Sequence, residues 1–419
     1  MQYLCEMDES QTLSMYSGHP MGLFPSNPNA PRVVITNGMM IPNYSTVENY
    51  DRMYALGTTM YGQMTAGSYC YIGPQGIVHG TTLTLLNAGR KYLPLPTANA
   101  SASSGDVDTN PLRGRVFLSS GNGGMSAAQL KAAVICGCIG VIAEVDRRAI
   151  DKRVKQGWAQ EVFDDLDALI KRIRQARQEK HVTSIAFHGN VVSIWERLVE
   201  EHKQTGQVLV EIGSDQTSLH NPYQGGYYPV DTSFEQAQII MKENAAEFKE
   251  LVHMSLRRQM AAINYLSEQT GLRFFDYGNA LLYTAAIAGA DVMDPHDPSQ
   301  KKFRYPSYVQ EFMGDIFSLG FGPFRWICTS GLESDLLTTD EIALQVMTRL
   351  HDAEGLQQNI KAQFEDNILW IKDAHKNKLV VGSQARILYA DCEARALISV
   401  EINKAIKDGR IKVSKKRHK

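Results

Sequence analysis

Apolar runs of strand length alternate with longer segments of helical periodicity along the middle of the chain. The runs are bounded by glycine or polar residues, which is typical of strands, whereas apolar residues three or four positions apart predict amphipathic helices. The expected strands are residues 115–120, 140–145, 184–188, 207–212 and 273–277. The expected helices are residues 126–138, 160–178, 192–203 and 233–268. This alternation predicts an α/β fold with a parallel sheet.

The segments on either side of this alternation are less regular. The elements expected there are short strands and turns over 12–45 with a strand at 32–37, helices at 47–57, 81–92 and 340–378, and a strand at 379–389. We therefore predict a Rossmann-like parallel sheet domain flanked by N- and C-terminal segments of a second mixed α/β domain.

A polar stretch separates the first flank from the alternating region. Residues 98–111 are small and polar and bury too little apolar surface to order themselves, so we interpret them as a loop or linker. We place a domain boundary there. The division that we expect is an N-terminal region at 1–108, a Rossmann-like nucleotide-binding domain at 109–303 and a C-terminal region at 304–419.

Composition narrows the classes of protein that the chain can belong to. The 419 residues are 43% apolar and 21% charged, which is ordinary for a globular protein, and the net charge of −2 gives no support to a nucleic-acid partner. No apolar run reaches the roughly 18 residues of a membrane span, and the acidic N-terminus lacks the basic start of a secretory signal. We therefore expect a cytoplasmic protein without membrane contact.

The six cysteines are scattered along the chain. Their dispersal fits a reducing compartment, and the spacing of Cys136 and Cys138 is wrong for a structural zinc site. We expect both to be small buried apolar residues and expect no metal site.

A glycine-rich turn carries the first candidate chemistry. Between the expected strand at 115–120 and the expected helix at 126–138, Gly121 permits a tight turn and Gly123 lets the backbone approach a phosphate closely. The helix N-terminus then offers free N–H groups to a pyrophosphate, with Ser126 as the small third residue of the pattern. The pattern indicates a dinucleotide site, although a glycine turn without a nucleotide stays open as an alternative.

An acidic residue follows at a suitable distance. Glu144 ends the next expected strand, close to the spacing of about 20 residues at which an acid binds the adenosine ribose hydroxyls. This arrangement favours NAD over NADP, although Arg147 and Arg148 lie close by and weaken that preference.

Two further turns follow expected strands. Residues 189–191 and 214–218 lie after the strands at 184–188 and 207–212. Because ligands of open parallel sheets bind beyond the carboxyl ends of the strands, both turns could line the same crevice. Each alone could equally be an ordinary turn.

Several motifs together resemble the urocanase family, most closely its animal and protist branch. The string YGQMTAG at 61–67 is highly specific. The matching stretches are residues 34–38, 60–68, 71–78, 123–129, 215–218, 276–279, 322–326 and 384–387. They lie in the family's order and span nearly the whole chain.

The resemblance implies an enzyme, a hydro-lyase of histidine catabolism. Members of this family hydrate urocanate to 4-imidazolone-5-propionate, with tightly bound NAD acting as an electrophile rather than as a redox carrier. The resemblance also implies a homodimer.

Site residues follow from the resemblance, motif by motif. The NAD contacts that it implies are Gln63, Gly124, Met125, Ser126, Glu144, Asn190, Val191, Gln216, Thr217, Ser218, His220, Tyr227, Tyr228 and Tyr277. For the substrate carboxylate we expect Arg325, because arginine forms bidentate pairs with carboxylates, together with Thr65. A structural ion pair is the alternative role for Arg325.

The chain departs from the family pattern at both ends. A glycine-rich segment of the family would precede Met1, and the segment with the family's active-site acid or cysteine would follow Lys419, so we expect the catalytic residues beyond the chain end. Cys392 does not match that cysteine. Two functions therefore stay open: a urocanate hydratase, or a truncated urocanase-like protein that binds NAD without hydrating urocanate. A dehydrogenase that transfers hydride is a third and less favoured function.

Overall fold

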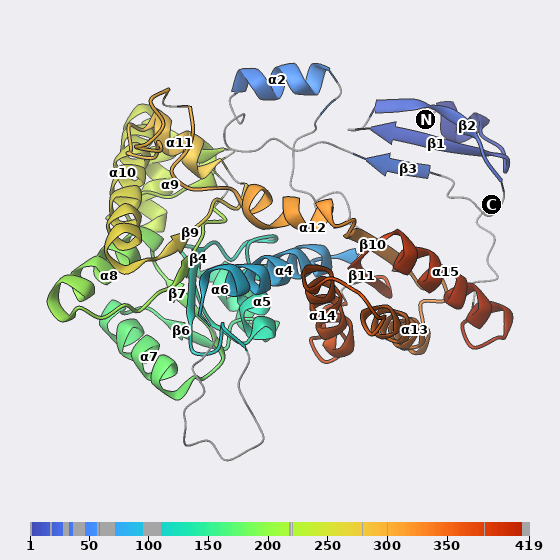
Figure 1. Ribbon diagram of the computed structural model, residues 1–419. Coiled ribbons are helices and arrows are strands. Elements are labelled where there is room, and N and C mark those ends of the chain that lie inside the picture. Colours follow the sequence, from blue (N-terminus) through green and yellow to red (C-terminus); the bar gives the residue numbers. More distant parts are fainter. Residues whose placement is uncertain are drawn as a thin grey trace, which may run out of the picture.

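A computed structural model gives the fold of the protein (Figure 1). The residues that it describes are 2–16, 19–27, 33–36, 47–56, 58, 72–94, 110–217, 219, 221–278, 280–299, 301–380 and 382–412.

A six-stranded parallel sheet forms the centre of the molecule, as the alternating pattern predicted. Its strand order is β6-β7-β5-β4-β8-β9, and every neighbouring pair is parallel. The strands are β4 (Val116–Ser120), β5 (Ile139–Glu144), β6 (Glu161–Phe163), β7 (Thr183–His188), β8 (Ile212–Gly213) and β9 (Arg273–Phe274). Because helices cover both faces, the middle strands are buried on both sides, which explains their nearly continuous apolar sequence.

Successive residues of β4 point into two different hydrophobic cores. Val116 and Leu118 belong to one core, and Phe117 between them belongs to the other. The first core includes residues of α7 (Leu166–Glu179), α8 (Val191–Thr205), α9 (Phe234–Glu243), α10 (Ala245–Thr270) and α11 (Leu281–Ile287). The second includes residues of α4 (Gln75–Tyr92), α5 (Ala128–Cys136) and the C-terminal elements. The sheet is therefore covered by helices on both faces.

The two flanks form smaller sheets. In the N-terminal flank, β1 (Gln11–Tyr16) lies between β2 (His19–Pro25) and β3 (Val33–Thr36). In the C-terminal flank, β10 (Gly322–Ile327) pairs antiparallel with β11 (Ala385–Ala390). The flanking helices are α1 (Gln2–Glu6), α2 (Val47–Ala55), α12 (Gly314–Ser318), α13 (Glu333–His351), α14 (Gln358–Asp373) and α15 (Cys392–Lys407), and two π-helical turns are η3 (Pro222–Gly226) and η4 (Val309–Met313). None of the helices in the described part of the chain has the length and apolarity of a membrane span.

Helix α4 connects the central sheet with the C-terminal flank. It packs against α5 and against β11, and Figure 1 shows it between these parts. The side-chain amide of Gln75 donates to the Ala385 carbonyl at 2.9 Å, and Arg386 donates to the Gln75 carbonyl oxygen at 3.2 Å. The Arg386 guanidinium also pairs with Asp340 at 2.5 Å. A buried polar network therefore joins residues that are far apart in the sequence.

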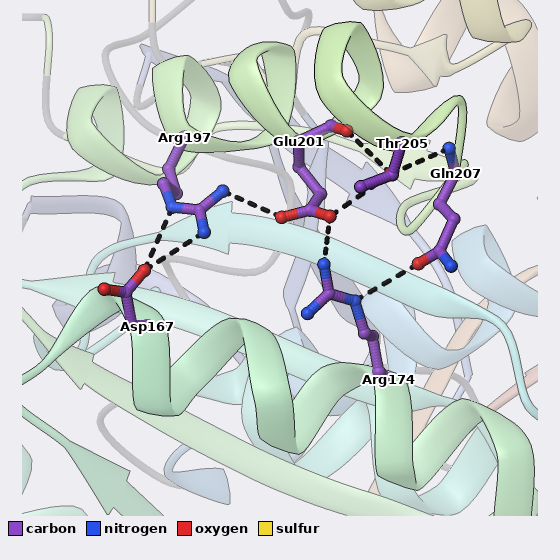
Figure 2. Close-up of polar contacts among 6 residues, drawn as sticks. All are labelled: Asp167, Arg174, Arg197, Glu201, Thr205 and Gln207. Carbon is purple, nitrogen blue, oxygen red and sulfur yellow. Dashed lines mark hydrogen bonds and ion pairs between the residues drawn. The ribbon is translucent and has the colours of Figure 1, made fainter.

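An ion-pair network joins helices α7 and α8 on one face of the sheet (Figure 2). The buried carboxylate of Glu201 accepts hydrogen bonds from Arg174 on α7 and, at 2.9 Å, from Arg197 on its own helix. Arg197 in turn pairs with Asp167 on α7 at 3.0 Å. Burial alone would raise the pKa of Glu201, but the hydrogen bonds from Arg197 and Arg174 outweigh it and the pKa is lowered.

Several sequence-based boundaries were wrong. The strand expected at 207–212 is confined to Ile212–Gly213, because the Glu211 carboxylate accepts the Val116 N–H at 3.0 Å where a ladder bond would otherwise form. Only Ala385–Ala390 of the segment 379–389 is a strand.

The sequence patterns missed several helices and strands. Among them are α1, α6 (Arg147–Lys155), α11, α12, α15, β6 and β10. Helix α6 is so highly charged that only Ile150 and Arg153 are buried, which leaves little apolar periodicity to detect. Residues 98–109 of the expected linker lie outside the described residues.

Candidate functional site

The glycine-rich turn between β4 and α5 has the geometry that its sequence predicts. Gly121 adopts a left-handed backbone conformation (φ +91°), and a Cβ there would lie 2.7 Å from the Ser126 hydroxyl oxygen. That hydroxyl accepts the Gly123 N–H at 3.0 Å. Helix α5 begins at Ala128 rather than at Ser126, because residues 124–127 form a turn ahead of it. Gly121 and Ser126 therefore fix a turn in which Gly123 and Gly124 are exposed.

Glu144 lies at the carboxyl end of β5, where its side chain contacts this turn. Its two carboxylate oxygens accept the N–H groups of Asn122 at 2.6 Å and of Asp146 at 3.0 Å. Burial raises the pKa of Glu144, and the two backbone hydrogen bonds only partly oppose that shift. A carboxylate can accept about four hydrogen bonds, so this one retains capacity for ligand hydroxyls.

An open cavity of about 720 Å³ lies beyond the carboxyl ends of β4, β5, β7 and β8. Its lining includes the predicted residues Ser126, Glu144, Asn190, Val191, Gln216, Thr217, Tyr227 and Tyr228. It also includes Ser120, which we did not predict although it ends a strand beside the glycine turn. The structure thus brings together turns that we considered separately in the sequence, at the edge where open parallel sheets bind ligands.

The other predicted residues are not among the described residues that line this cavity. Gly124 and Met125 belong to the glycine turn but are not among the cavity-lining residues, and Met125 packs against the hydrophobic core. The Tyr277 ring stacks on Tyr308 with 4.4 Å between ring centroids, and its hydroxyl lies 2.8 Å from that of Thr81. The residues Gln63, Thr65, Ser218 and His220 lie outside the described residues.

Asp215, which follows β8, holds two of the residues that line the cavity, Ser120 and Thr217. This fully buried carboxylate accepts hydrogen bonds from the Ser120 hydroxyl at 2.7 Å, the Gln259 amide at 2.9 Å and the Thr217 N–H at 2.8 Å. The Thr217 hydroxyl donates a further bond at 2.5 Å. Sequence analysis missed Ser120 and Gln259 as its partners, because nothing in the sequence links α10 with this turn.

Asn190 connects α8 with the opposite wall of the cavity. Its side-chain oxygen caps α8 by accepting the Val192 N–H at 2.9 Å, and its amide donates to the Tyr228 carbonyl at 2.8 Å. One side chain thus fixes both the helix N-terminus and the turn that carries Tyr228.

The residues that are present fit a dinucleotide. The Gly123 N–H is bonded to Ser126, and the first N–H groups of α5 are bonded to carbonyl groups of the turn, so the start of α5 does not offer the free donors that the sequence predicts. The exposed Gly124 still lets a phosphate approach the backbone of the turn, while Glu144 stands where a ribose would lie. The amide nitrogen of Gln216 is buried in the cavity wall and has no partner in the described part of the chain, so it can donate to a ligand.

Arg325 lies in the other sheet, on β10 opposite Ile387. It is partly buried, its Nε atom has no partner among the residues that the structure describes, and it interacts electrostatically with the buried His79 and Tyr389. Burial lowers the pKa of His79 to about 3, so the imidazole is neutral. Its Nε2 lies 2.9 Å from the Asn367 carbonyl oxygen. Sequence analysis missed His79, because no motif around it in α4 indicates a functional site.

Comparison with known proteins identifies the family. Residues 73–312 match the model of the urocanase Rossmann-like domain, and residues 1–70 and 315–415 match the urocanase N-terminal and C-terminal domains. The chain belongs to the urocanase family. Both the resemblance seen in the motifs and the Rossmann-like fold class are thereby confirmed.

Curated relatives of this urocanase chain are urocanate hydratases. It is 59% identical to those of Mus musculus and Homo sapiens over 412 residues, and 56% identical to a probable urocanate hydratase of Dictyostelium discoideum over 409 residues. Each alignment covers 98% of this chain but 58% of the relative, so the chain spans little more than half their length.

Proposed function

We propose that this chain binds NAD in the cavity beyond β4, β5, β7 and β8 and acts as a urocanate hydratase. The observation that carries the proposal is the set of predicted cofactor residues that line one cavity in a member of the urocanase family. The domain division at 1–108, 109–303 and 304–419 and the full list of predicted contacts are part of this proposal.

The cofactor roles follow from the chemistry of each side chain. The pyrophosphate lies against the backbone of the exposed turn at Gly124, and Glu144 accepts the adenosine ribose hydroxyls. A carboxylate there repels a 2′-phosphate, which favours NAD over NADP. When bound, NAD supplies an electron-poor ring for the reaction; the chain orients that ring and keeps it in place.

Arg325 binds the substrate carboxylate in this proposal, with Thr65 as a second contact. Its backbone is held on β10, and its buried Nε–H has no acceptor among the described residues. A planar guanidinium binds a carboxylate through two parallel hydrogen bonds and so orients it as well as attracting it. The neighbouring His79 is neutral and therefore does not compete for the anion.

We further propose that the protein is a cytoplasmic homodimer with urocanate as its small-molecule ligand. The net charge of −2 argues against a nucleic-acid partner. Light scattering of the purified chain measures the oligomeric state directly.

The proposal is tested with the purified chain in two assays. Equilibrium dialysis should show NAD bound, and the ultraviolet absorbance of urocanate should fall in the presence of NAD. The Arg325→Lys variant keeps the charge but loses the bidentate geometry, so it should bind NAD normally and consume urocanate more slowly. Absence of NAD binding would overturn the cofactor site. Binding without loss of urocanate absorbance would reject hydratase activity for this chain, and reduction of the nicotinamide would indicate a dehydrogenase.

A further inference from the structure

Two buried carboxyl groups lie at the carboxyl ends of neighbouring strands. Asp215 follows β8 and Asp276 follows β9, and both side chains are almost completely buried. The backbone of Asp276 is fixed, because its N–H donates to the Pro306 carbonyl at 2.9 Å and its carbonyl accepts the Tyr308 N–H at 2.8 Å. The two carboxyl groups are therefore held in place by the sheet and by the loop before η4.

The two carboxyl groups differ sharply in their hydrogen bonding. Asp215 accepts bonds from Ser120, Gln259 and Thr217, so both of its oxygens have donors. By contrast, the buried Oδ1 atom of Asp276 has no hydrogen-bond partner among the described residues. An unpartnered buried oxygen is costly, so this atom is available for a ligand or for a proton.

The groups that face Asp276 include no described cation. Asp215 faces it from the end of β8 and Tyr308 from the start of η4, while the Gly278 N–H donates to its carboxyl group. Burial, followed by the charge of Asp215, raises the pKa of Asp276 to about 7. At neutral pH the Asp276 carboxyl is therefore partly ionised, and no cation of the described residues pairs with it.

The sheet topology places this pair on one half of the dinucleotide site. A dinucleotide lies across the point where the strand order reverses, with its adenosine ribose at the acid after the second strand. That acid is Glu144 on β5, and β8 and β9 lie on the other side of β4. The nicotinamide half therefore lies on the side of Asp215 and Asp276.

We propose that the Asp215–Asp276 pair is the counter-charge for the cationic nicotinamide ring and makes the site prefer the oxidised dinucleotide over the reduced one. The inference rests on the proposed NAD site. The oxidised ring carries a positive charge and the reduced ring is neutral, so only the first gains from a nearby carboxylate. Binding of the oxidised form then releases the proton of Asp276 to solvent, whereas binding of the reduced form does not.

Isothermal titration calorimetry of the purified chain tests the inference, with NAD⁺ and NADH as ligands. Titration in buffers of different ionisation enthalpy counts the protons released. For NAD⁺ we expect proton release near neutral pH and an affinity that rises roughly tenfold from about pH 6 to about pH 8. For NADH we expect neither effect. Equal pH dependence for both ligands would overturn the inference.

Two variants complete the test. In Asp276→Asn the preference for NAD⁺ should shrink by about tenfold and the proton release should disappear. Asp291→Asn removes the same charge from a side chain that is 71% exposed and outside the cavity, so the preference should persist. If Asp276→Asn does not fold, the pH series with NAD⁺ and NADH on the unaltered chain still tests the counter-charge. Failure to bind either dinucleotide would reject the NAD site itself, whereas binding with an unchanged preference in Asp276→Asn would reject only the counter-charge.

Discussion

The side chain of Asn190 makes two hydrogen bonds that hold opposite walls of the cavity together. Its oxygen accepts the Val192 N–H at the start of α8, and its amide donates to the Tyr228 carbonyl at 2.8 Å. Residues of both walls line the same cavity. A single side chain therefore connects the start of α8 with the segment that carries Tyr228 at the proposed cofactor site.

Replacing Asn190 should separate its two roles. Asn190→Ala loses both bonds and should lower the free energy of unfolding by about 1 kcal/mol, as for a lost N-cap, and weaken NAD binding. Asn190→Asp keeps the cap but loses the donor to Tyr228. It should therefore retain stability in thermal denaturation and still bind NAD more weakly by calorimetry. Normal affinity in Asn190→Asp would show that the bond to Tyr228 does not shape the site.

Glu144 should control both the glycine turn and the choice of dinucleotide. In Glu144→Gln one of the two N–H groups, from Asn122 or Asp146, would face an amide donor instead of an acceptor. We expect a loss of about 1–3 kcal/mol in NAD binding free energy and a smaller preference for NAD over NADP. Calorimetric titration with both dinucleotides measures the two effects. An unchanged preference would remove Glu144 from the ribose site.

His79 should make stability sensitive to acid. The folded protein holds it neutral with a pKa of about 3, whereas an unfolded histidine titrates near pH 6.5. Because the unfolded chain binds the proton first, the contribution of His79 is present above about pH 6.5 and is lost as the pH falls toward 3.

His79→Gln keeps a donor for the Asn367 oxygen but cannot titrate, so its stability should fall less on acidification than that of the unaltered protein. His79→Leu removes the donor and should destabilise by about 1–3 kcal/mol at neutral pH. Urea denaturation across a pH series checks both expectations. Parallel pH curves for the unaltered protein and His79→Gln would contradict the first.

The network around Glu201 should stabilise the α7–α8 layer. Its side chain is 3% exposed, so an amide in its place would accept from only one of Arg174 and Arg197 and would turn a buried NH2 donor toward the other. Glu201→Gln should lower the free energy of unfolding by about 1–3 kcal/mol at neutral pH. Because the folded-state pKa is lowered, this contribution is present above the unfolded pKa and is lost as the pH falls through the folded pKa.

The neighbouring Glu200 provides a matched control. Its charge has no role in the network of Figure 2, so Glu200→Gln should change stability by less than about 0.5 kcal/mol. Chemical denaturation of both variants at neutral and acidic pH measures the difference. Equal effects of the two substitutions would mean that the network contributes nothing specific.

The sequence was sufficient for the features that depend on local pattern. The glycine turn at Gly121, the acid at the end of β5 and the polar turn after β8 could be predicted to meet, because parallel strands end at one edge. The motif resemblance identified the family before the fold was known.

Features that depend on long-range packing could not be predicted in this way. Gln259 reaches Asp215 from the middle of α10, and His79 meets Asn367 across 288 residues of sequence. Neither pair has a local signal, since each residue alone fits an ordinary amphipathic helix. The opposed environments of Asp215 and Asp276 likewise emerge only when two distant strands lie side by side.

Helix α4 links the proposed cofactor site to the strand that carries the proposed substrate-binding Arg325. One side of it packs on α5, which begins at the glycine turn, and its first residue is bonded to the Ala385 carbonyl of the strand that pairs with the one carrying Arg325. The hydrogen bonds of Gln75 and Arg386 thereby connect the proposed cofactor site with the proposed substrate site. A displacement of either proposed site would therefore be felt by the same helix, which couples the position of β10 and Arg325 to that of the glycine turn.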